Sequence, residues 1–132
     1  IRRLDMYMLR KKVISILNQK IQFPYDKIKN IIEEKHYDTI QYLMKEDNFN
    51  LKEYLNSYPE ELSGGQLQKL YLYKILQEKK QVLILDEPTS ALDGQSTKIL
   101  FKILQKIKKG RIIIIITHDM NFEKIADGIL NL

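Results

Sequence analysis

The sequence has 132 residues, of which 44% are hydrophobic and 30% charged, a length and composition typical of one globular domain with a modest core. It contains no cysteine, which excludes disulfide frameworks and thiolate metal sites. The net charge is +5, but lysine is spread along the whole chain, so we favour a solvated lysine-rich surface over a nucleic-acid-binding patch.

The first half of the chain contains one strand followed by helices. Residues 13–17 form a β-branched run that predicts a strand. Residues 24–56 have apolar side chains at the spacing of short helices and no strand run between them, which predicts a small helical insert. A turn that contains Pro59 leads into a longer helix, whose apolar residues are Leu67, Leu70, Tyr71, Tyr73 and Ile75.

The second half alternates strands with helices. Residues 82–88 predict a buried strand that Pro88 ends, and residues 95–109 predict an amphipathic helix that Gly110 ends. Residues 111–119 predict a second buried strand, followed by a short helix over 121–127 and a last strand over 128–132. This alternation predicts an α/β fold whose parallel sheet is covered on both faces.

Both predicted buried strands end in polar residues. In open parallel sheets, ligands bind outside the carboxyl ends of the strands. Asp86 and Glu87 follow the first strand, and Thr117, His118 and Asp119 follow the second. One such residue alone would be an ordinary strand end, but two strands that end this way favour a functional site.

The acid pair suits phosphate chemistry with magnesium. Mg²⁺ prefers one or two carboxylates together with substrate phosphates and water, so Asp86 is a candidate ligand. Glu87 is then a candidate to orient or deprotonate a water, and His118 could donate a hydrogen bond to a terminal phosphate. A zinc role for His118 is disfavoured, because His36 is the only other histidine and no ligand spacing links the two.

The residues Ser63-Gly64-Gly65 stand at the head of a predicted helix. A helix N-terminus presents unpaired N–H groups and a partial positive charge, and glycine lets an anion approach the backbone closely. The segment is therefore a candidate polyphosphate clamp. A flexible turn with a serine N-cap explains the same residues, and it would be preferred if this segment stood alone.

Taken together, these segments resemble the ATP-binding cassette (ABC) ATPase family. "LSGGQ" at 62–66 is similar to the family's signature motif, "VLILDE" at 82–87 to its Walker B strand, and "SALD" at 90–93 to its D-loop. "ITHD" at 116–119 is similar to its switch-histidine motif, and "ILNQ" at 16–19 looks like its Q-loop. Several motifs in register are far more specific than the signature alone.

The resemblance implies a role for each matching residue. Asp86 would help to hold Mg²⁺, Glu87 would be the catalytic base and His118 would contact the γ-phosphate. Gln19 would sense Mg²⁺ or the attacking water and would couple the ATPase to a transport domain.

It also implies an active site shared between two subunits. In this family the signature residues act in trans, on ATP held by the other nucleotide-binding domain of a head-to-tail dimer. The residues concerned are Ser63, Gly64, Gly65 and Gln66. Asp93 would lie at the same interface.

Two departures from the family pattern stand out. None of the five glycines lies in a phosphate loop ending in Gly-Lys-Ser/Thr, so we expect this Walker A part to lie upstream in a longer parent chain. Lys69 and Lys74 stand where the family usually has arginine, and Leu67 replaces a basic residue. Because lysine lacks the bidentate fork of arginine, we expect weaker contacts there.

The resemblance implies an α/β fold: the parallel-sheet C-terminal half of a P-loop NTPase core with an inserted all-helical signature subdomain. We expect residues 1–23 to end the N-terminal core part, 24–80 to form the helical subdomain and 81–132 to complete the core.

The leading hypothesis is the nucleotide-binding domain of an ABC transporter of export type. It would hydrolyse ATP at the cytoplasmic face of the cell membrane, with a second nucleotide-binding domain and a transmembrane domain as partners and no nucleic acid. A soluble ABC ATPase that acts on ribosomes or DNA is an alternative, although "SALD" and the lack of heptads count against it. A pure interaction module that binds no nucleotide is a third.

Overall fold

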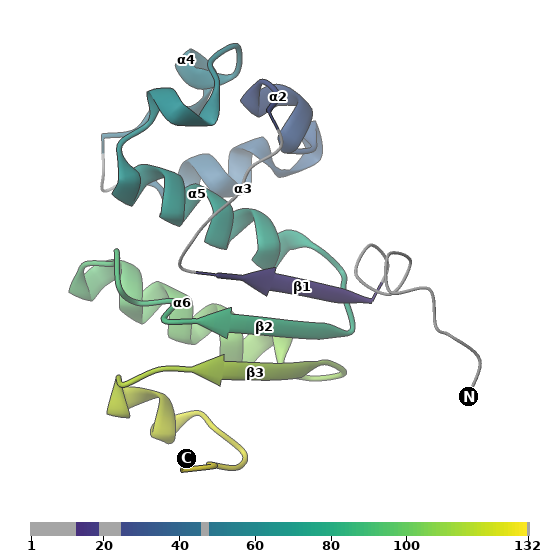
Figure 1. The fold of residues 1–132 in the computed structure, drawn as a ribbon, viewed down its shortest axis with the longest axis vertical. Coiled ribbons are helices and arrows are strands. Elements are labelled where there is room, and N and C mark those ends of the chain that lie inside the picture. The colour runs from purple at the N-terminus through teal and green to yellow at the C-terminus, as the bar shows by residue number, and fades with distance from the viewer. Residues whose placement is uncertain (1–12, 19–24, 46–47, 132) are drawn as a thin grey trace. The chain divides into compact units, whose positions relative to one another are not determined.

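The computed structural model describes residues 13–18, 25–45 and 48–131, and the backbone divides into two compact units (Figure 1). One unit takes the described residues up to Ile16 and those from Lys80 onward, and the other takes those from Leu17 to Lys79. No helix in the described part of the chain is both long enough and apolar enough to cross a membrane.

The unit from Leu17 to Lys79 is helical. Its elements in chain order are α2 (Ile28–Ile31), the 3₁₀ turn η1 (Glu34–His36), α3 (Tyr37–Leu43), α4 (Leu51–Tyr54), the 3₁₀ turn η3 (Pro59–Glu61) and α5 (Gly64–Gln77). This agrees with the short helices that the apolar spacing predicts.

The side-chain amide of Gln41 fixes the connection between α3 and α4. Its Nε2 donates to the Phe49 carbonyl and its Oε1 accepts from the Leu51 amide, both at 2.6 Å. The second bond satisfies one of the N–H groups that α4 leaves unpaired at its start.

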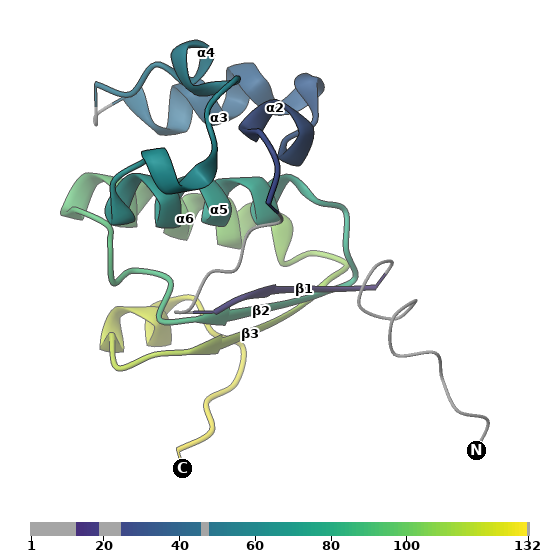
Figure 2. The same ribbon diagram turned by 45° about the horizontal axis from the view of Figure 1, so that its top comes forward.

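The other unit contains a three-stranded sheet. Strands β1 (Ile14–Leu17), β2 (Val82–Asp86) and β3 (Ile112–Ile116) lie in that order, and β2 pairs with β3 in parallel. The crossover helix α6 (Gly94–Ile107) connects β2 to β3 and lies over one face of the sheet (Figure 2). This confirms the α/β class with a parallel pair, which the order of the segments predicts.

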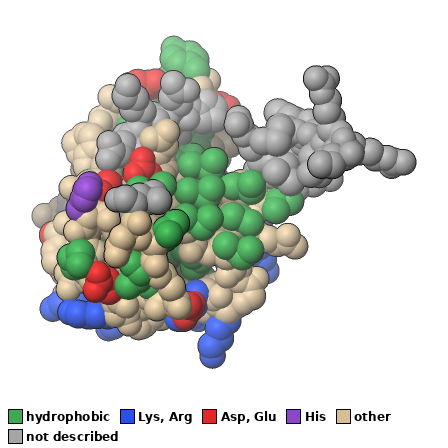
Figure 3. Space-filling model, turned by 60° about the horizontal axis from the view of Figure 1, so that its bottom comes forward, with side chains coloured by type: hydrophobic (Ala, Val, Ile, Leu, Met, Phe, Trp, Pro, Cys, Tyr) green, Lys and Arg blue, Asp and Glu red, His purple; other side chains and the backbone are tan. Residues whose placement is uncertain are grey.

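The two faces of β2 and β3 differ sharply in burial. Leu83 and Leu85, on the face toward α6, are 1% and 0% exposed. On the opposite face of β3, Ile112, Ile114 and Ile116 are 62%, 46% and 56% exposed. Figure 3 shows hydrophobic side chains gathered on one face of the molecule.

The prediction of a sheet covered on both faces is therefore wrong for the described part of the chain. Consecutive strand residues point to opposite faces, so a run of five isoleucines supplies apolar side chains to both. Only one of these faces is covered by described residues. The apolar run indicates that the second face needs a covering layer, but it does not show that the described residues form one.

Two C-terminal elements also differ from the prediction. The helix expected over 121–127 is a 3₁₀ turn, η4 (Met120–Lys124), and the described residues of the strand expected over 128–132 form no strand. A strand needs a neighbour to pair its backbone N–H and C=O groups. The described residues 128–131 pair with none of the three strands of the described sheet.

Truncation of one side chain on each face tests this asymmetry. We expect Leu85→Ala to lower the free energy of unfolding by about 2–5 kcal/mol, because it leaves a cavity under α6. Ile114→Ala should cost clearly less, since that side chain is already 46% exposed. Urea unfolding of both variants checks this. Equal losses would mean that the isoleucine face is covered in solution.

Candidate functional site

The pairing of β2 with β3 brings their polar ends together. Asp86 lies opposite Ile116 in the parallel register. One residue further, the Glu87 amide donates to the Ile116 carbonyl at 2.8 Å. The side chain of Glu87 therefore begins beside Thr117 and His118, although 30 residues separate them in sequence.

The backbone at Glu87 is left-handed, with φ of 46°. This region costs a residue with a side chain roughly 1–2 kcal/mol, and such residues persist where their surroundings hold them. The bond to Ile116 and two bonds to the Glu87 carboxylate do so here.

Both oxygens of the Glu87 carboxylate accept hydrogen bonds from the end of β3. Oε2 accepts from Thr117 Oγ1 and Oε1 accepts from the His118 amide, each at 3.1 Å. The His118 imidazole is fully exposed, with Nε2 3.8 Å from Glu87 Oε1. The carboxylate is held in place, while the imidazole extends into solvent.

Asp86 is the other acid at this edge. It is half-buried, and none of the residues that the structure describes donates a hydrogen bond to its carboxylate or pairs with it. In the described ranges no three His, Asp or Glu side chains cluster as metal ligands. A Mg²⁺ site built from one protein carboxylate, substrate phosphates and water fits this donor set.

The start of α5 is closed by a capping box. Ser63 Oγ accepts from the Gln66 amide at 3.3 Å, and Gln66 Oε1 accepts from the Ser63 amide at 3.1 Å. No described group accepts from the amides of Gly64 and Gly65, which are exposed at the first two helical positions. Because the Ser63 hydroxyl acts as acceptor in the cap, its proton stays available for donation.

The glycines at this helix start are not required by the packing of the chain. A Cβ atom added to Gly64 or Gly65 would meet nothing within 4 Å, and neither glycine has a positive φ. This chain would therefore accept alanine at both positions. The space above the two glycines is therefore open to a group from outside this chain.

Asp93 has a structural task in this chain. It is the N-cap of α6: Oδ1 accepts from the Ser96 amide at 2.7 Å and Oδ2 from Ser96 Oγ at 3.2 Å. The predicted place of Asp93 at a subunit interface is untested, and so are the roles of the other site residues. Gln19 lies outside the described residues.

The sequence placed Thr117 and Asp119 at the end of β3 but indicated no specific role for either. Thr117 Oγ1 donates to Glu87, and the same atom accepts from the Asp119 amide at 3.0 Å. The available signal was a hydroxyl residue next to His118 at a strand end that faces an acid. Only the strand register shows that these groups meet.

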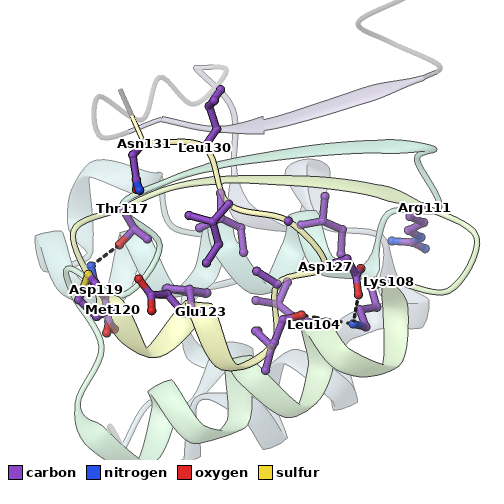
Figure 4. A pocket seen from close by; sticks show the side chains of 17 residues that line it. Leu104, Lys108, Arg111, Thr117, Asp119, Met120, Glu123, Asp127, Leu130 and Asn131 are labelled. Carbon is purple, nitrogen blue, oxygen red and sulfur yellow. Dashed lines mark hydrogen bonds and ion pairs between the residues drawn. The ribbon is translucent and has the colours of Figure 1, made fainter.

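A cavity of about 320 Å³ lies between β3, α6, η4 and the C-terminal segment, and Glu87 is not among the residues that line it. Thr117 and Asp119 line one end, and Lys108 lines the other, where its Nζ pairs with Asp127 at 2.8 Å (Figure 4). Ile113 and Ile115 also line it, among other apolar side chains.

Comparison with known proteins agrees with the motifs. A family model described as "ABC transporter" matches residues 2–90. The glutamine transport ATP-binding protein GlnQ of Geobacillus stearothermophilus is 32% identical over 114 residues, which cover 85% of this chain and 46% of that protein. The L-cystine import ATP-binding protein TcyN of Bacillus subtilis is 31% identical over 137 residues, covering 96% of this chain and 53% of that protein.

A solved structure has the same fold. It is entitled "Dimeric Structure of MJ0796, a Bacterial ABC Transporter Cassette", and it matches with a TM-score of 0.69 at 19% identity. The match covers 96% of this chain and 61% of that one. The chain thus spans about half the length of the two curated relatives named above.

The cap at Asp93 can be tested in this chain alone. We expect Asp93→Ala to lower the free energy of unfolding by about 1 kcal/mol, because the Ser96 amide loses its acceptor, whereas Asp93→Asn should retain most of the stability. Thermal unfolding followed by circular dichroism measures both. No loss in the alanine variant would show that the cap contributes nothing.

Proposed function

Because the chain belongs to the ABC transporter family, we propose that it is part of a nucleotide-binding domain that hydrolyses ATP to drive transport. One observation carries the proposal: Glu87 is held by the end of β3 directly beside Asp86, whose carboxylate has no described partner. An oriented base next to a free carboxylate suits phosphoryl transfer to water.

The residues at the strand ends divide the work. Asp86 would hold Mg²⁺, which neutralises charge on the phosphates when bound. Glu87 would orient the attacking water and accept its proton, because each of its oxygens keeps a lone pair beyond the bond it accepts. The exposed imidazole of His118 could donate to the terminal phosphate.

The start of α5 would serve the ATP of a partner domain. The amides of Gly64 and Gly65 and the hydroxyl proton of Ser63 are three donors at the positive end of a helix. A phosphate could approach them closely, because nothing in this chain fills the space above either glycine. Gln66 supports the site through the capping box, and Asp93 would lie at the same interface.

The rest of the nucleotide site would come from polypeptide beyond this chain. The relatives are about twice as long as the matched region, and we propose that the parent protein carries the phosphate loop. The isoleucine face of β3 would then be covered by that part of the domain. Gln19 would take the Q-loop role. The chain alone should hydrolyse ATP negligibly, since the main phosphate-binding loop is missing.

The names of the relatives favour transport. A transmembrane domain as partner and a place at the cytoplasmic face of the membrane are part of the proposal. The export type predicted from the sequence has no support among the relatives. Those whose names state a direction are import proteins, including the methionine import protein MetN 1 of Oceanobacillus iheyensis, which is 46% identical over 71 residues. That match covers 52% of this chain and 21% of that protein. We propose no transported substrate.

A charge-neutral change of the base tests this function. In the complete domain, Glu87→Gln should lower ATP turnover by at least about 100-fold, because amide nitrogen cannot accept a proton, while ATP binding persists. The matched control is Glu123→Gln on η4, an exposed acid of the same unit. Phosphate release and nucleotide fluorescence measure the two properties. Normal turnover in Glu87→Gln would reject the assignment of the base.

A second change separates folding from phosphate contact at α5. We expect Gly65→Ala to stabilise the fold by up to about 1 kcal/mol, because alanine is the better helix former. It should nevertheless weaken ATP-dependent dimer formation by about tenfold or more, since the methyl group keeps a phosphate from the amide.

Light scattering of the complete domain, in the Glu87→Gln background, measures the dimer. Gly128→Ala is the matched control: that glycine too has open space around a Cβ and lies in the other unit. Unchanged dimer formation in Gly65→Ala would remove the trans clamp.

A further inference from the structure

We infer that Thr117 is a positioning residue that fixes the carboxylate of Glu87 before any nucleotide arrives. This inference rests on the proposed function and adds a residue to it. Its basis is a chain of hydrogen bonds within the unit that contains β2 and β3, all between described residues.

The donors and acceptors determine the direction of each hydrogen bond in this series. The Asp119 amide can only donate, and it donates to Thr117 Oγ1 at 3.0 Å, as Figure 4 shows. The hydroxyl therefore spends a lone pair on Asp119 and directs its proton elsewhere. Glu87 Oε2 lies 3.1 Å away and accepts it.

A second donor holds the other oxygen. The His118 amide donates to Glu87 Oε1 at 3.1 Å. The adjacent residues Thr117 and His118 therefore each form a hydrogen bond to one oxygen of the Glu87 carboxylate. A glutamate side chain has several rotatable bonds and, with one oxygen held, could still rotate. With both held, the plane of the carboxylate is fixed as well as its position.

The two hydrogen bonds to the Glu87 carboxylate coincide with a strained backbone at the same residue. With φ of 46°, Glu87 occupies a region that only local contacts make tolerable, and this conformation directs its side chain toward β3. The side chain is 20% exposed, so it is neither buried as a core residue nor free in solvent. Each oxygen retains a lone pair for a water molecule, so the base is oriented without being consumed.

His118 cannot replace the hydroxyl. Its Nε2 lies 3.8 Å from Glu87 Oε1, beyond hydrogen-bond distance, and its ring is fully exposed. The imidazole is thus available for another task, while the amide of the same residue and Thr117 orient the base.

Three variants test the inference. Thr117→Val keeps the shape of the side chain and removes the hydroxyl, whereas Thr117→Ser keeps the hydroxyl. Thr39→Val, at an exposed position on α3 in the other unit, is the matched control. Each is made in the 132-residue chain and in the complete domain.

In the chain alone, amide hydrogen exchange followed by NMR reports on these hydrogen bonds without any nucleotide. We expect the His118 amide to exchange about three- to tenfold faster in Thr117→Val, because a carboxylate held at one oxygen moves away from it more often. Thr117→Ser should restore the slow exchange, and Thr39→Val should not alter it. An unchanged rate in Thr117→Val would overturn the inference.

In the complete domain, kcat should fall about tenfold in Thr117→Val with KM unchanged, because the hydroxyl orients the base and does not bind ATP. Thr117→Ser should recover most of kcat. A parallel rise in KM, or no rescue by serine, would indicate a merely structural role and would overturn the inference. If the unmodified domain hydrolyses ATP and Thr117→Val matches it, only this inference fails. No hydrolysis by the unmodified domain would overturn the proposed function as well, whatever the exchange rates show.

Discussion

The parallel register between β2 and β3 is the constraint on which the strand-end site depends. Val82 lies opposite Ile112 and Asp86 opposite Ile116, and the bond from the Glu87 amide to Ile116 extends the pairing by one residue. A slip of one residue would turn every side chain of the strand to the other face. Because Leu83 and Leu85 must face α6, such a slip would expose the buried leucines. Core packing thus fixes where the Glu87 carboxylate meets Thr117.

Two residues of the proposed site, Ser63 and Asp93, are helix caps, and their capping atoms differ in chemistry. Ser63 caps α5 as an acceptor and keeps a proton for an incoming anion. Asp93 caps α6 with both carboxylate oxygens and has no proton to give. An anion would therefore be attracted to the first cap and repelled by the second. Asp93 could bind a partner protein only by accepting hydrogen bonds from that partner's donor groups.

Sequence patterns predicted the features that depend on residues close together in the sequence. The apolar runs gave β2 and β3, the turn residues gave the start of α5 at Gly64, and the strand ends gave Asp86 and Glu87. Features that depend on a neighbour could not be read this way. Residues 128–132 look like a strand, but the described ones pair with no described strand, and the isoleucine face of β3 has no described cover. The bond from Thr117 to Glu87 joins residues 30 apart, so it needed the register.

The charge at the strand ends limits how the proposed site could bind ATP. Among the described residues at the ends of β2 and β3, Asp86, Glu87 and Asp119 are three carboxylates, and the exposed imidazole of His118 is the group that could carry a positive charge. A triphosphate would be repelled there unless cations and donors outnumber the acids. Magnesium supplies part of that charge, and helix-start amides like those of Gly64 and Gly65 can supply more. We therefore expect the acids at this edge to act on a nucleotide that other parts of the assembly hold, which is consistent with a base oriented in advance by Thr117.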